Sequence, residues 1–93
     1  MTTSLGVIGI LLNKAQSAFE KALQLDPSFH KCRINLACVF DLLSKHTSAI
    51  AEITEKLPAE TKASNEAKRI LAIAYYNADE EEKAEKIWKE LKL

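Results

Sequence analysis

The sequence predicts an all-α fold built from stacked helical repeats, and three observations lead to that prediction. The chain has 93 residues, of which 47% are hydrophobic and 28% charged, with two glycines and two prolines, a composition typical of a helix-rich globular domain. A helix-stopping Asp26-Pro27 follows a long apolar-periodic segment. A small residue followed four positions later by a large apolar one recurs in steps of 34 and 35 residues, at Ala15/Phe19, Ala49/Ile53 and Ala84/Trp88. Self-similarity at this period is typical of a helical array.

The opening segment, Ser4 to Leu25, is predicted as one helix or as two. Apolar residues keep i, i+3, i+4 spacing along all of it, which favours one continuous helix, although Gly6 and Gly9 each weaken it by about 1 kcal/mol relative to alanine. A complete first repeat needs a separate helix before Ala15, so this repeat is expected to be truncated, as in a piece of a longer array. The apolar residues left without a partner helix are candidates for self-association: Leu5, Ile8 and Leu12.

The second helix is expected to begin after Pro27 with Ser28 as its cap and to run to about Leu43. Its buried stripe is predicted to contain Leu36, Ala37, Phe40 and Leu43.

The third helix follows the turn Ser44-Lys45-His46, with Ser44 or Thr47 as cap. It is predicted to reach about Leu57 and to bury Ala49, Ile50, Ile53 and Leu57. Residues 58–64 form the next break, although Pro58 could equally open a longer helix.

The fourth helix is expected to end near Asn77, with an inner stripe of Ile70, Leu71, Ala74 and Tyr75. The last helix is predicted to start at a capping-box-like pair, Asp79 with Glu82.

The charge balance argues against nucleic acid and anionic membranes as partners. Thirteen basic residues match thirteen acidic ones, and the split is even along the chain, so no basic face is indicated. The longest apolar run, Leu5 to Leu12, spans about 12 Å as a helix, far less than the ~30 Å of a bilayer core, so no membrane insertion is expected. Cys32 and Cys38 lie about 240° apart around one predicted helix, so we expect reduced thiols in a cytoplasmic protein.

Residues for catalysis or for a cofactor do not converge in the sequence. His30 with Cys32 could suggest part of a metal site, but they point in different directions on a helix, and no other soft ligands are near them. We expect two exposed histidines, His30 and His46, with no metal, no cofactor and no catalytic residue, and therefore not an enzyme.

The residues described so far resemble the tetratricopeptide repeat, whose pattern places W-x2-L-G-x2-Y on a first helix and A-x3-F then P on a second. Leu36-Ala37-x-x-Phe40 and Leu71-Ala72-x-x-Tyr75 match the first helix, and the three pairs at Ala15, Ala49 and Ala84 match the second. Arg33 and Lys68 stand where the pattern has tryptophan.

The resemblance implies a right-handed α-α superhelix of about two and a half helix-turn-helix repeats forming a single domain over residues 1–93. The truncated first repeat is residues 1–27, the second is 28–58 and the third is 59–93. First helices of such arrays line a concave groove that binds a protein or peptide. The positions that the resemblance places on this groove are Lys31, Ile34, Asn35, Cys38, Asp41, Glu66, Arg69, Ile70, Ile73 and Tyr76. The isoleucines and Tyr76 could instead pack between helices.

Three other functions are considered for the same residues: a carboxylate clamp, an assembly subunit and an RNA-binding repeat protein. A relative of this family grips a C-terminal carboxylate with a basic ring, but Glu66 and Ile70 stand where that ring needs basic residues, so a carboxylate clamp is not expected. An assembly subunit, active as a homodimer through its open repeat ends, is the alternative to a scaffold that binds a partner. An RNA-binding repeat protein would need a basic groove, which a neutral chain does not supply.

Overall fold

The structure is a computed structural model that describes residues 5–92, together with the side chains of residues 6–92. Over this range the chain is all-α, with six helices and no strand. The helices are α1 (Leu5–Leu25), α2 (His30–Leu42), α3 (His46–Thr54), α4 (Ala59–Lys62), α5 (Asn65–Asn77) and α6 (Glu81–Glu90). The predicted all-α class is therefore confirmed. Of the described helices, none has the length and apolarity required to cross a membrane.

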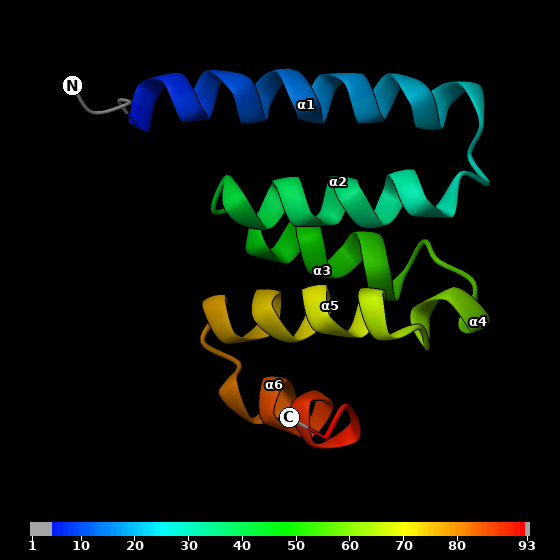
Figure 1. Ribbon diagram of the computed structural model, residues 1–93, viewed down its shortest axis with the longest axis vertical. Coiled ribbons are helices and arrows are strands. Elements are labelled where there is room, and N and C mark those ends of the chain that lie inside the picture. Colours follow the sequence, from blue (N-terminus) through cyan, green and yellow to red (C-terminus); the bar gives the residue numbers. More distant parts are fainter. Residues whose placement is uncertain (1–4, 93) are drawn as a thin grey trace.

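The helices form a flat assembly with principal extents of 39 × 35 × 19 Å. In Figure 1, α1, α2 and α5 lie one below the other, and α3 packs alongside α2 and α5. The helices α2 and α5 run in the same direction, antiparallel to α1. The last helix, α6, packs against α5 and is seen nearly end-on, so it crosses α5 more steeply than α3 crosses α2.

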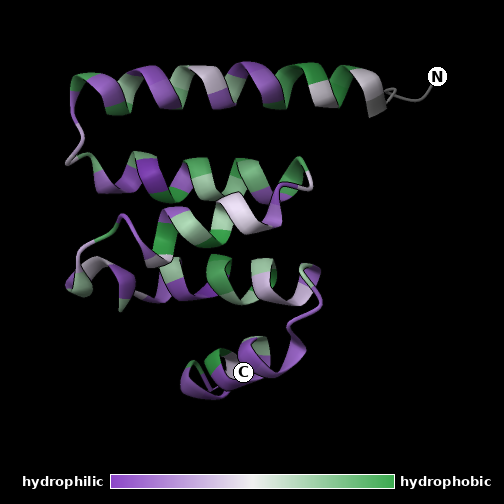
Figure 2. Ribbon diagram, turned by 180° about the vertical axis from the view of Figure 1, so that it is seen from behind, coloured by the Kyte–Doolittle hydropathy of each residue, from purple (hydrophilic) through white to green (hydrophobic). Residues whose placement is uncertain are grey.

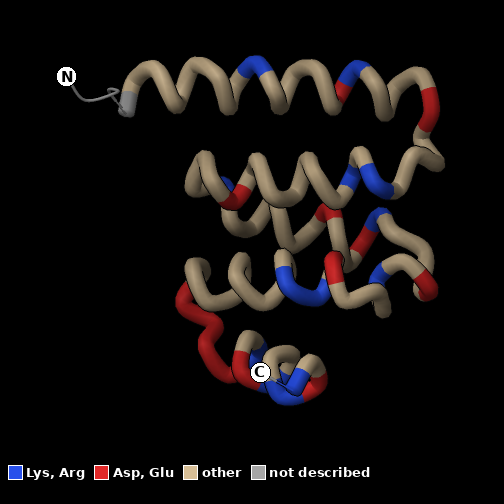
Figure 3. The backbone as a smooth tube through the Cα atoms, in the orientation of Figure 1, with Lys and Arg blue, Asp and Glu red and all other residues tan. Residues whose placement is uncertain are grey.

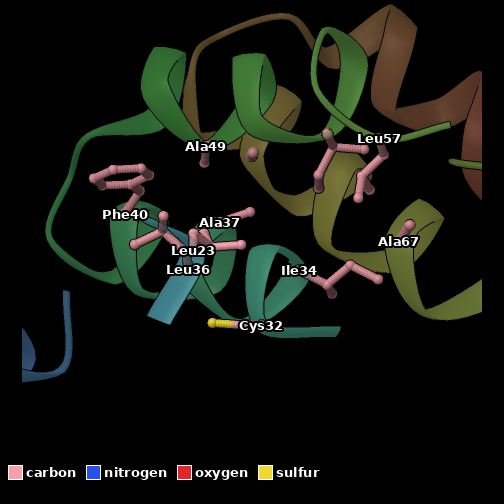
Figure 4. Close-up of a cluster of buried hydrophobic side chains, with 11 residues drawn as sticks. Leu23, Cys32, Ile34, Leu36, Ala37, Phe40, Ala49, Leu57 and Ala67 are labelled. Atoms are coloured by element: carbon pink, nitrogen blue, oxygen red, sulfur yellow. The ribbon is translucent and has the colours of Figure 1, made fainter. Parts of the chain in front are cut away.

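One hydrophobic core joins α1, α2, α3 and α5 (Figure 4). Ile53 of α3 is fully buried in this core, which also contains Leu36 and Phe40 of α2. From α1, only residues near the C-terminal end take part: Leu23 is buried, and Phe19 and Ala22 are partly buried against the core. The predicted inner stripes of the helices are thus the faces that the structure buries.

The turn between α2 and α3 and the turn between α5 and α6 have the same backbone geometry at an offset of 35 residues. Ser44 and Asp79 both have a φ of 63°, in the left-handed region. The next residues, Lys45 and Glu80, are the N-caps of α3 and α6, with φ, ψ of −96°, 61° and −105°, 60°. In both turns the N-cap amide donates to the carbonyl oxygen five residues earlier, at 2.7 and 2.8 Å. Two helix-turn-helix units, 30–54 and 65–90, are therefore closed in the same way.

Small residues occupy the helix contacts of both units at the same 35-residue offset. Among the alanines without exposed surface, two pairs stand 35 residues apart: Ala37 and Ala72 in the first helices, and Ala49 and Ala84 in the second. An alanine at a contact lets the axes of two helices approach closely, because it fills little of the space between them. The large partners of the predicted pairs differ more, since Ile53 is fully buried and Trp88 only partly.

The start of α2 differs from the prediction. Ser28 does not cap the helix, because its amide and hydroxyl both donate to the Asp26 carboxylate, at 3.1 and 2.6 Å, in an Asx-type turn. These two hydrogen bonds, the hydroxyl's first, hold the pKa of Asp26 below its ordinary value. The N-cap is Phe29, with no side-chain hydrogen bond.

The predicted caps of the third helix were also wrong, since Lys45 is its N-cap and neither Ser44 nor Thr47 closes it. This helix ends at Thr54 and not near Leu57, because Pro58 disfavours helical backbone at the residue before it. Leu57 is nevertheless buried. Pro58 precedes only the one-turn α4, and does not open a longer helix. Ser64 was not predicted as a cap, but it is the N-cap of α5, where its hydroxyl accepts from the Ala67 amide at 3.2 Å.

The start of α6 does not use the predicted capping box. Asp79 lies in the left-handed turn and is not the N-cap, which is Glu80. The Glu80 carboxylate pairs with Lys83 at 2.9 Å and raises the pKa of that lysine, first through this hydrogen bond. The acidic residues remain at the positive end of the helix dipole, as expected for this run (Figure 3).

The first helix is a single continuous helix of 21 residues, which confirms the favoured prediction for this segment. Its first turns extend past the end of α2 (Figure 1). Lys45, in the turn that follows α2, donates to Gln16 at 2.9 Å. Gln16 therefore lies beside the C-terminal end of α2. Residues 5–12 lie beyond this point and form an overhang of α1, and the side chains of residues 6–12 take no part in the core.

Candidate interaction site between α2 and α5

The residues predicted to line a groove lie on two neighbouring parallel helices. Five of them come from α2 and five from α5, and the two helices contact each other directly. Because the helices are parallel, residues 35 positions apart lie at matching heights on them. Cys38 therefore corresponds to Ile73, and Asp41 to Tyr76.

A small apolar depression lies between these helices. It has a volume of about 110 Å³ and is lined by Cys38, Asp41, Leu42, Ile70 and Ile73. Four of these five residues were predicted for the groove from the sequence. Leu42 was not, although its spacing of four residues from Cys38 places it on the same helix face. A volume somewhat below that of a cavity that holds benzene suits one aliphatic side chain.

The one carboxylate at the depression already has partners. Asp41 Oδ1 pairs with His46 Nδ1 of α3, and Asn77 Nδ2 of α5 donates to Asp41 Oδ2 at 3.0 Å. Burial, and then the nearby Asp41 charge, raise the pKa of the Cys38 thiol, which keeps it neutral at physiological pH. The walls of the depression therefore suit an uncharged ligand group.

Exposed hydrophobic side chains surround the depression at the C-terminal ends of α2 and α5. Leu42, Ile73 and Tyr76 are between 48% and 62% exposed. The ring of Tyr76 lies 5.8 Å from the ring of Trp88 in α6, at an interplanar angle of 45°, which is a favourable tilted geometry for two aromatic rings. The position of Tyr76 is thus held by α6.

The other predicted groove residues lie elsewhere on the same two helices. Lys31, Asn35, Glu66 and Arg69 are exposed, nearer the N-terminal ends of α2 and α5. Ile34 is 3% exposed and belongs to the core, so it cannot contact a partner directly. The alternative that some isoleucines pack between helices thus holds for Ile34 and in part for Ile70, which packs against the core, whereas Ile73 is half exposed.

A second depression, of about 240 Å³, lies between α1, α2 and α3 and contains a buried ion-pair cluster. Glu52 is only 4% exposed, and its carboxylate pairs with Arg33 at 3.0 Å and with Lys56 at 2.6 Å. Arg33 also donates to the Pro27 carbonyl oxygen at 3.3 Å. These contacts tie α2 to α3 and to the preceding loop, which is a structural role.

The three residues predicted for self-association differ in their exposure. Ile8 is 42% exposed and Leu12 partly buried, whereas the side chain of Leu5 lies outside the part that the structure describes. Both histidines are partly buried and not fully exposed as expected: His46 pairs with Asp41, and His30 Nδ1 is buried without a protein partner.

The two cysteines are free thiols, as predicted, with Cys32 buried and its pKa raised by that burial. Within residues 5–92 the structure brings together no group of three histidine, cysteine or acidic side chains suited to a metal ion.

Comparison of the chain with protein-family models, with curated proteins and with solved structures found no match in any of the three.

Proposed function

We propose that this chain is a tetratricopeptide-like helical-repeat module that binds a segment of another protein. In this proposal the units 30–54 and 65–90 are two repeats, α1 supplies the second helix of a truncated one, and together they form a right-handed superhelix of about two and a half repeats. The similar turn geometry supports the repeat through its spacing, because the two turns lie 35 residues apart, the period of the sequence pattern; a left-handed residue by itself is a common helix ending. The direct contact of α2 with α5, the first helix of each unit, supports stacking in one array.

The observation that carries the binding proposal is the depression between α2 and α5. A largely apolar pocket for one aliphatic side chain, lined in part by exposed Leu42 and Ile73 and near exposed Tyr76, is the anchor that an apolar peptide face needs. The polar residues nearer the N-terminal ends, among them Asn35, Glu66 and Arg69, then contact the more polar part of the ligand. The partner is an amphipathic helix or an extended peptide with a few charges.

The remaining expectations follow from this proposal. The chain acts as a scaffold and not as an enzyme, and it needs no cofactor. Its neutral net charge gives no reason for nucleic acid to bind. A cytoplasmic location fits free thiols at Cys32 and Cys38.

A selection from random peptides tests the proposal. Peptides of about 16 residues displayed on phage are selected on the immobilised chain, and the affinity of each selected peptide is measured by fluorescence polarisation. Ile73→Glu places a charge in the depression and is expected to weaken binding by at least about tenfold, because the anchor pocket becomes polar. Ser48→Glu adds the same charge at an exposed position of α3, outside the site, and is expected to leave binding unchanged.

The result that would refute the proposal is equally definite. Selected peptides that bind the Ile73→Glu and Ser48→Glu variants with the same affinity as the parent chain would show that the depression is not the binding site.

A further inference from the structure

The turn between α5 and α6 places carboxylates close to the depression between α2 and α5. Residues 79–82 are Asp-Glu-Glu-Glu, and we call them the acidic turn (Figure 3). It begins where the exposed apolar end of α5 stops, since the Asp79 amide donates to the Tyr76 carbonyl oxygen at 3.1 Å. Figure 2 shows the C-terminal half of α5 mostly green or pale and the turn that follows it purple. An apolar anchor site and a charged surface are therefore neighbours here.

The described part of the chain does not balance the charge of the acidic turn. Glu80 forms an ion pair with Lys83 at 2.9 Å. The other three carboxylates are exposed, and they pair with no described cation, Lys86 of α6 included. The positive end of the α6 dipole and Lys83 together offset about one and a half charges, so about two and a half negative charges remain.

The other charges at the C-terminal ends of α2 and α5 do not supply the missing cations. Asp41, at the depression, is hydrogen-bonded to His46 and Asn77 and to no lysine or arginine. Lys45 is directed toward α1, where it donates to Gln16. The parallel helices α2 and α5 also end here, and each adds the negative end of its dipole. A ligand bound at the depression therefore meets a negative potential on the side of α6.

We infer that the segment bound at the depression is basic: an aliphatic side chain fills the depression, and neighbouring lysine or arginine side chains contact the acidic turn. Complementary charge across an interface selects the partner and speeds encounter. Ile73 and Asp79 are six residues apart, about 9 Å at the rise of a helix, and three extended residues of a bound segment span ~10 Å. This inference rests on the proposed function, since it names the class of segment that binds at the same site.

The selection from random peptides described above tests the inference, because its library has no bias toward basic residues. The selected peptides are expected to be enriched in lysine and arginine at least about twofold relative to the library, and depleted in aspartate and glutamate. Their affinity for the parent chain is expected to fall at least about fivefold between about 50 mM and about 500 mM salt, because salt screens exposed charges.

A variant that removes charge from the acidic turn is the direct test. Asp79→Asn/Glu81→Gln removes two unpaired carboxylates, and asparagine tolerates the left-handed backbone at position 79, where φ is 63°. It is expected to weaken the binding of the selected peptides at least about fivefold at low salt, and less at high salt. Circular dichroism shows whether the variant keeps its helix content.

The matched control removes the same net charge elsewhere. Glu55 at the end of α3 and Glu60 in α4 are both exposed, and they lie beyond the N-terminal end of α5. The helix α5, about 20 Å long, separates them from the acidic turn, which is more than a Debye length. Glu55→Gln/Glu60→Gln is therefore expected to change the affinity by less than about twofold.

Ile73→Gln distinguishes failure of this inference from failure of the proposed function, since it removes the anchor contact without adding charge. Peptides that Ile73→Gln weakens, but that show no excess of basic residues and bind Asp79→Asn/Glu81→Gln as tightly as the parent chain, would overturn this inference alone. Peptides that bind Ile73→Gln as tightly as the parent chain would overturn both, because the basic side chains would then have no anchor beside the acidic turn.

Discussion

Arg33 of α2 and Glu52 of α3 form a buried ion pair, with 3.0 Å between Nη1 and Oε1 and side chains that are 13% and 5% exposed. Arg33 stands where the tetratricopeptide pattern has tryptophan. Lys68, 35 residues later, occupies the corresponding place in α5 and pairs with Glu90 of α6 at 3.2 Å. In both units, therefore, a cation of the first helix pairs with a carboxylate of the second.

Removing Arg33 is expected to destabilise the fold. Arg33→Ala leaves the buried Glu52 carboxylate with Lys56 alone, and the expected loss is about 3 kcal/mol, near the lower end for breaking a buried pair. Lys68→Ala is the matched control and is expected to cost less than about 1 kcal/mol, because that pair is substantially exposed. Urea unfolding of both variants measures the difference, and equal losses would contradict the structural role assigned to the Arg33 pair.

Glycine at the two left-handed turn positions is expected to stabilise the chain. Ser44 and Asp79 both have a φ of 63°, which costs an ordinary residue about 1–2 kcal/mol and glycine nothing, although glycine loses more entropy on folding. We expect Ser44→Gly to gain about 0.5–1 kcal/mol and Asp79→Gly somewhat less, since aspartate tolerates this conformation. Thermal unfolding measures both. Ser48→Gly, inside α3, should instead lose about 0.5–1 kcal/mol.

Gly9→Ala is expected to strengthen the overhang of α1. A Cβ at Gly9 would meet no atom within 4 Å, so the substitution adds helix propensity of about 1 kcal/mol without a clash. Because the overhang takes no part in the core, the gain should appear as slower amide hydrogen exchange in residues 6–12 and not as a large change in global stability. Measured at low concentration, unchanged exchange there would argue against a helix in this segment.

The two thiols are expected to differ in their reaction with alkylating reagents. Burial raises the pKa of both, so each holds less thiolate at neutral pH than a free cysteine and reacts more slowly, with the rate increasing as the pH rises. Cys38 is partly exposed and Cys32 is buried, so Cys38 should react first. A peptide bound in the depression should protect Cys38 and leave the rate at Cys32 unchanged, which mass spectrometry of the labelled chain can follow.

Much of the fold could be predicted because apolar spacing is a local property of the sequence. The structure agrees with three such predictions: the inner stripe of α2, one continuous helix for α1, and the end of α5 near Asn77. The helix starts were predicted less well, because a polar side chain near a start can bind several groups. Ser28 donates to Asp26 and does not cap α2, whereas Ser64 does cap α5. Spacing alone does not distinguish these two serines.

The candidate site shows the same division. The resemblance to the tetratricopeptide repeat implied that Cys38, Asp41, Ile70 and Ile73 share one surface, and the structure brings these four residues to one depression between α2 and α5. That Ile34 is buried, that Asp41 is hydrogen-bonded to His46 and Asn77, and that Leu42 completes the depression depend on how closely α2, α3 and α5 approach. By itself the sequence determined which residues face inward, through periodicity. Only the tertiary structure decided which of those faces are covered, because coverage depends on where a neighbouring helix ends, as it does beside the overhang of α1.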